Sequence, residues 1–154
     1  MPVSTTYDKF DDRTSYGTGL HLIDNHSEIQ GTHWALFSFS VDPKIEKGHL
    51  LLVRVGEGWI WSDETRVVVI ADDTRIETDN PRRVNASSLF PAGSHNASLD
   101  GLQDALELDL TKEQCLAMAK ATNPIEGKAG SLQFAFGKGF MKDISEAVGA
   151  HSAN

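Results

Sequence analysis

Short β-type segments recur about every ten residues between residues 16 and 78, and this spacing limits the folds open to the chain. Residues 32–41 carry apolar side chains on both faces of a strand, 49–55 are mostly apolar, and 67–71 are rich in β-branched residues. Glycine, proline, asparagine and aspartate separate these segments, as they do at turns between neighbouring strands. We therefore expect an antiparallel β-sheet meander that forms a sandwich or an open barrel.

The last third of the chain mixes strand and helix patterns. Leucines alternate with acidic residues over 106–110, and residues 132–136 also alternate, so both segments are predicted to be strands. Between them, Thr111 and Gln114 fit a capping box, in which each side chain bonds the backbone N–H of the other residue. This motif predicts a helix that runs from there to about Thr122.

A second helix is predicted near the end of the chain. Phe140, Ile144 and Val148 are spaced so that they share one helix face, and Gly149 is the expected C-terminal cap. The predicted fold class is therefore α+β, an antiparallel sheet with two C-terminal helices packed on it.

One domain spanning residues 1–154 is expected, because about 100–200 residues commonly share one core. Residues 1–15 are polar and lack periodicity, which predicts a loose N-terminal arm. Residues 79–101 contain turn-forming residues throughout and are expected to form a long loop.

The charge of the chain restricts its partners. The net charge is −8 with a pI near 5.1, and the acidic excess is spread evenly without a basic cluster. A nucleic acid or an anionic membrane needs clustered lysine and arginine, so neither is an expected partner. The single cysteine, Cys115, excludes an internal disulfide, and no signal peptide is visible, so a cytoplasmic location is expected.

Three residues near the start form the candidate metal site. His21, Asp24 and His26 carry imidazole and carboxylate groups, the ligands that zinc and other divalent ions accept, and His33 lies downstream. Their spacing matches no established ligand motif, and aspartate and asparagine are also typical of turns.

Two further pairs are candidate ligand-binding residues. Trp59 and Trp61 point to the same face if they lie on a strand, so their indoles would form a stacking platform or cover the core. Arg82 and Arg83 would supply a fork for a carboxylate or phosphate, unless they point to different sides.

Motifs for a catalytic nucleophile or a nucleotide-binding loop are absent from the sequence. The leading hypothesis is therefore a non-enzymatic binding module for a protein or small ligand, including an acidic inhibitor that covers a basic target, with no cofactor. One alternative is a metal-dependent hydrolase that uses the histidines and Asp24. Another is a hydrophobic-ligand carrier with a cavity inside the sheet. The edge strands of an open sheet also permit a homodimer.

Overall fold

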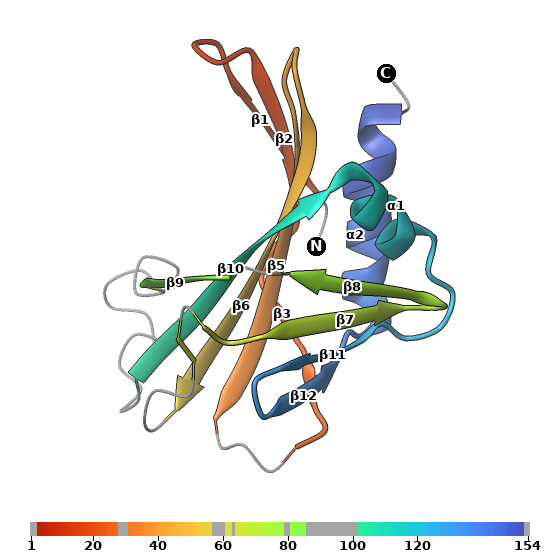
Figure 1. Cartoon of the computed structure of the whole chain (residues 1–154). Coiled ribbons are helices and arrows are strands. Elements are labelled where there is room, and N and C mark those ends of the chain that lie inside the picture. The colour runs from red at the N-terminus through yellow and green to blue at the C-terminus, as the bar shows by residue number, and fades with distance from the viewer. Residues whose placement is uncertain are drawn as a thin grey trace.

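The computed structural model describes residues 3–27, 31–56, 61–62, 64–78, 81–85 and 102–152. Two antiparallel sheets and two helices make up this part of the chain (Figure 1). Sheet A has the order β1-β2-β5-β6-β10-β9, with the short β3 also paired to β5. Its strands are β1 (Ser4–Asp8), β2 (Arg13–Gly17), β3 (His21–Leu22), β5 (Thr32–Val41), β6 (Glu46–Gly56), β9 (Arg82–Asn85) and β10 (Leu102–Thr111).

Sheet B is smaller and has the order β4-β12-β11-β7-β8. Its strands cross in front of the long strands of sheet A in the view of Figure 1. They are β4 (Asp24–Asn25), β7 (Val67–Ala71), β8 (Thr74–Thr78), β11 (Glu126–Ala129) and β12 (Leu132–Ala135). The helices are α1 (Lys112–Lys120) and α2 (Lys138–Ser152).

The main hydrophobic core lies between one face of sheet A, sheet B and the two helices. We call this face of sheet A its inner face. Helix α1 packs on β6 and β10, while α2 packs on β5 and β2. Burial of apolar area from all three layers in one cluster is the main stabilising contribution. The cluster includes Phe37, Leu50 and Leu108 from sheet A, Val69 and Phe134 from sheet B, and Cys115 and Ile144 from the helices.

The outer face of sheet A carries a second, smaller apolar cluster. Val53, Val55 and Ala105 are buried there, and Trp34 and Leu51 pack against them. The alternation of side chains along each strand separates this cluster from the main core.

The predicted α+β class is confirmed, as is the packing of two C-terminal helices on the sheet. The capping box is present at Thr111, where the strand β10 ends and α1 begins. Strand order departs from chain order at several points: β2 pairs with β5 and β6 with β10 in sheet A, while β4 pairs with β12 and β11 with β7 in sheet B. Within the described residues, no helix is both long enough and apolar enough to cross a membrane.

Several elements differ from the sequence-based expectations. Residues 1–15 were expected to be a loose arm, but residues 4–15 belong to the β1–β2 hairpin, which ends at Gly17 and projects from the sheet in Figure 1. Strand β9 lies within the expected loop 79–101; residues 79–80 and 86–101 are outside the described part of the chain. Gly149 does not end α2, which continues to Ser152, and Gly149 does not adopt the positive φ of a glycine cap.

Candidate functional site

The three predicted metal ligands are held in different settings. His21 lies on β3, where Nε2 is 2.8 Å from Oδ2 of the buried Asp143 of α2, and its ring stacks on Phe140. Asp24 lies on β4 and is exposed, as is His26 just beyond it. The chain passes from sheet A to sheet B between β3 and β4, which separates the three side chains. His21 therefore joins a helix to a strand, and the three predicted ligands are not among the described residues whose ligand atoms lie close together.

His33, also considered as a ligand, is buried on the inner face of β5 opposite Arg54 of β6. Burial disfavours the charged imidazolium, and the Arg54 cation adds to this, so the pKa of His33 falls to about 4. Its Nε2 has no hydrogen-bond partner. His33 is a neutral core residue near neutral pH.

The predicted indole platform is not available at Trp61. Trp61 is 4% exposed, and its Nε1 donates a hydrogen bond to the carbonyl oxygen of Ala129 at 3.2 Å. An indole contributes most to the stability of the fold when it is buried and its N–H has a hydrogen-bond acceptor. Both conditions are met for Trp61 in the core. Trp59 lies outside the described residues.

Arg82 and Arg83 do not form a fork. They are consecutive residues of β9, so their side chains point to opposite faces of sheet A. Arg82 lies over β10, where its guanidinium donates to Glu107 at 2.6 Å and to Asp109 at 2.9 Å. The predicted anion-binding arginine is thus paired within its own sheet.

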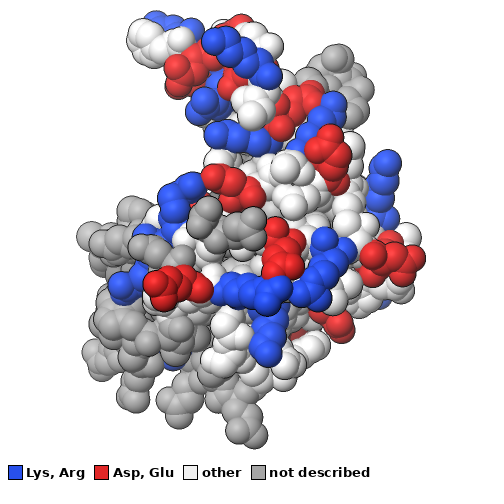
Figure 2. Space-filling model, viewed as in Figure 1, with Lys and Arg blue, Asp and Glu red and all other residues white. Residues whose placement is uncertain are grey.

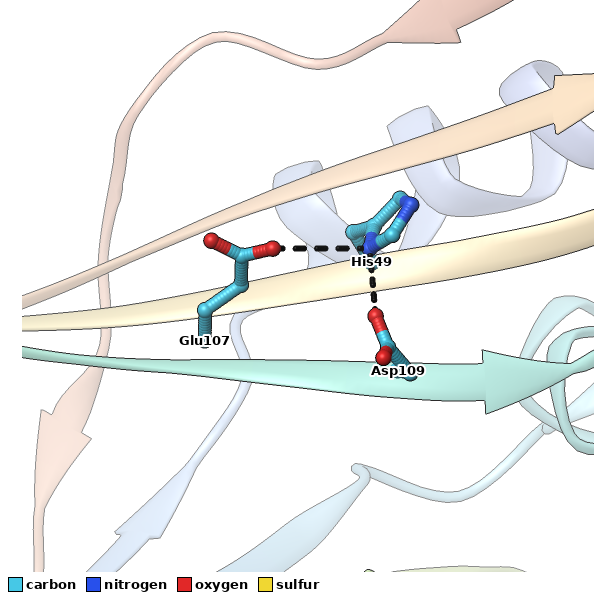
Figure 3. Close-up of side chains that lie close together, drawn as sticks. All are labelled: His49, Glu107 and Asp109. Atoms are coloured by element: carbon cyan, nitrogen blue, oxygen red, sulfur yellow. Dashed lines mark ion pairs between the residues drawn. The ribbon is translucent and has the colours of Figure 1, made fainter. Parts of the chain in front are cut away.

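Arg82 belongs to a polar cluster on the outer face of sheet A that sequence analysis missed, formed with His49, Glu107 and Asp109. Figure 3 shows the last three of these side chains. His49 of β6 lies directly opposite Asp109 of β10. Its Nδ1 is 2.8 Å from Oδ1 of Asp109 and 3.7 Å from Oε1 of Glu107. Among the described residues, His49, Glu107 and Asp109 are the group of metal-ligating side chains whose ligand atoms all lie within 4.8 Å of one another.

The electrostatics of the cluster favour an ionised Asp109. Hydrogen bonds from Arg82, its charge and the nearby His49 lower the pKa of Asp109. The two carboxylates raise the pKa of Arg82 in return. Despite its short distance to Asp109, Nδ1 of His49 is buried and makes no aligned hydrogen bond.

A second feature is a hollow of about 540 Å³ on the outer face of sheet B. Register brings its side chains together in two rows that run across the strands. In one row Ile70 lies opposite both Arg75 and Glu126, and in the other Val68 lies opposite both Glu77 and Lys128. The hollow is lined by His26, Arg66, Val68, Ile70, Arg75, Glu126, Gly127, Lys128, Gly130, Gln133 and Phe134.

The lining combines an apolar strip with positive charge. Ile70 is 44% exposed on β7, although its neighbours in sequence are buried. Arg66, Arg75 and Lys128 face a single lining carboxylate, Glu126. Figure 2 shows lysine and arginine side chains gathered beside acidic ones over β7 and β8. This local sign is opposite to the net charge of −8.

Glu77 of β8 partly neutralises this positive charge. It forms ion pairs with Arg66 and with Arg75, and the Arg66 hydrogen bond contributes most to the lowered pKa of Glu77. Because both arginines are more than half exposed, these surface pairs are weak and leave donors for a ligand.

Comparisons with protein-family models, curated proteins and solved structures found no match for this chain.

Proposed function

We propose that this chain is a binding module, and that its ligand lies in the hollow on the outer face of sheet B. The single observation that carries the proposal is the apolar strip of the half-buried Val68 and the exposed Ile70, bordered by cationic side chains in an open hollow of about 540 Å³. That volume falls within the range of roughly 300–1,000 Å³ common for ligand sites.

The chemistry of the lining favours a ligand with an apolar group and at least one carboxylate, as acidic peptide segments have. The apolar group would cover Ile70, which is otherwise in contact with water. The carboxylate would accept hydrogen bonds from Arg75 or Lys128, and arginine suits this role because its donors match a carboxylate in geometry.

The other functional hypotheses receive less support from this surface. An acidic inhibitor of a basic target needs clustered carboxylates, whereas most of the charged side chains that line this hollow are cationic. A hydrophobic-ligand carrier needs a cavity enclosed by the sheet, whereas this hollow is open and lies on the outside of sheet B. A hydrolase built on His21, Asp24 and His26 would need these side chains in one cleft.

The proposal is tested by nuclear magnetic resonance with acetylated peptides that contain leucine or phenylalanine beside glutamate. We expect resonance shifts confined to β7, β8 and β11 with the acidic peptides, and weaker ones with lysine-containing peptides of the same length. Ile70→Ser should weaken binding about fivefold or more, because it removes the exposed apolar contact.

Ile45→Ser is the matched control, since Ile45 is 52% exposed but lies outside the hollow. Its affinity should equal that of the unmodified protein. Shifts that map to another face, or equal binding of acidic and basic peptides, would contradict the proposal.

A further inference from the structure

The polar cluster on sheet A brings together three side chains with metal-binding atoms. His49 and Asp109 are directly paired across β6 and β10, and Glu107 lies two residues before Asp109 on the same face. Register therefore holds one imidazole nitrogen and two carboxylates within 4.8 Å, on two long neighbouring strands rather than on loops.

The imidazole nitrogen of this set makes no hydrogen bond, although it lies at ion-pair distance from two carboxylates. This atom, Nδ1 of His49, is shielded from water. A buried polar atom without a hydrogen bond is uncommon in proteins. A bound ion is one arrangement that would satisfy it. Figure 3 shows this nitrogen turned toward the carboxylates of Glu107 and Asp109.

We propose that His49, Glu107 and Asp109 form a binding site for a divalent transition-metal ion of the zinc and cobalt type. One imidazole with two carboxylates suits these ions, whereas calcium and magnesium prefer ligand sets made entirely of oxygen. Water would complete the coordination shell, since the His49 and Asp109 side chains are 27% and 51% exposed.

Arg82 competes with the metal at both carboxylates. Its Nη2 is 2.6 Å from Oε1 of Glu107, the same oxygen that faces His49, so metal binding must displace this contact. Its Nη1 donates to Oδ2 of Asp109, and this contact is compatible with a metal at Oδ1. Its Nη2 also donates to Oδ1, the oxygen that faces His49, at 3.2 Å, and a metal at Oδ1 competes with this second contact.

The test is a titration of the full chain with Co²⁺, followed by its visible absorption, and then displacement by Zn²⁺. We expect one saturable site for each chain. His49→Gln and Asp109→Asn should each weaken binding about tenfold or more. Arg82→Gln should bind several-fold more tightly, because the competing cation is gone.

Glu77→Gln is the matched control, because Glu77 is likewise a carboxylate paired with arginine but belongs to no metal-binding set with a histidine among the described residues. Its affinity for Co²⁺ should be unchanged, and urea denaturation would verify that each variant folds. The absence of a saturable Co²⁺ signal, or unchanged affinity in His49→Gln, would overturn the proposal. Weaker binding by Arg82→Gln would overturn the competition with Arg82. The hollow on sheet B shares no lining residue with this site, so the two proposals fail independently.

Discussion

His33 and Arg54 lie opposite each other on β5 and β6, and each is 2% exposed. Burying a titratable group disfavours its charged form, and a neighbouring cation has the same effect on an imidazole. The pKa of His33 in the folded chain is about 4, compared with an ordinary value of 6.5, so His33 stays neutral until the pH falls to about 4. A difference of this kind between the folded and unfolded states makes stability depend on pH.

The stability that depends on His33 should be present in full above about pH 6.5 and lost as the pH falls toward 4. Between these values the unfolded chain binds a proton at His33 and the folded chain does not, which favours unfolding. The full loss amounts to roughly 3 kcal/mol. Urea denaturation of the wild-type protein and of His33→Gln at several pH values measures it.

His26→Gln is the control for this prediction, because His26 is exposed. It should preserve the pH dependence of unfolding, whereas His33→Gln should flatten it between pH 6.5 and 4. Equal pH dependence in wild type and His33→Gln would show that His33 titrates normally.

At the scale of secondary-structure elements, helix α1 rests on β6 through a contact that leaves no room for a side chain. A Cβ added at Gly48 would lie 2.3 Å from Sγ of Cys115 and 3.3 Å from the ring of Phe37. Cys115 is fully buried, and this burial raises the pKa of its thiol to about 12. Gly48 and Cys115 are thus a complementary pair, and the thiol is a packing group rather than a nucleophile.

This complementarity predicts that two damaging substitutions partly compensate each other. Gly48→Ala should cost about 1–3 kcal/mol by overpacking, and Cys115→Ala should destabilise by leaving a small cavity. In the double variant the new methyl group occupies the space of the lost sulfur, so the combined cost should be less than the sum by about 1 kcal/mol. Urea denaturation of all four proteins measures this coupling.

Gly17→Ala is the control for overpacking, because its nearest atom, Oγ of Ser4, is 3.7 Å from the added Cβ. It should change stability little. Additive effects of Gly48→Ala and Cys115→Ala would mean that the two sites do not meet in solution.

At the scale of the whole molecule, the β1–β2 hairpin extends away from the layered core (Figure 1). All five residues of β1 are exposed, whereas Tyr16 of β2 is buried and belongs to the main core cluster. Tyr7 of β1 is 59% exposed and donates a hydrogen bond to Asp12. The hairpin is therefore anchored through β2, and its outer strand contributes little to the core.

Two tyrosines of this hairpin should consequently differ in their effect on stability. Tyr16→Ala should cost about 3 kcal/mol, because it removes a buried ring from the core. Tyr7→Ala should stay within about 0.5 kcal/mol, because the ring is largely in water. Denaturation midpoints of the two variants check this, and similar losses would contradict the described anchoring.

Local patterns in the sequence determined much of the secondary structure. The capping box at Thr111 and Gln114 needs only neighbouring residues, and it marks the start of α1 correctly. The β-branched run at 67–71 and the spacing of Phe140, Ile144 and Val148 likewise report which side chains share a face. Such periodicity is a property of a short segment, and it was enough to predict the α+β class.

Only the tertiary structure decided which segments lie beside one another. His49 and Asp109 are paired because β6 joins β10, and the two rows across sheet B exist because β11 joins β7. The short strands β4, β9 and β11 have weak patterns of their own and depend on those pairings. The sequence left open whether Trp61 belongs to a binding platform or covers the core, because its burial depends on the distant Ala129 and the residues around it. Strand register over long separations is set by packing of the whole chain, and no local pattern encodes it.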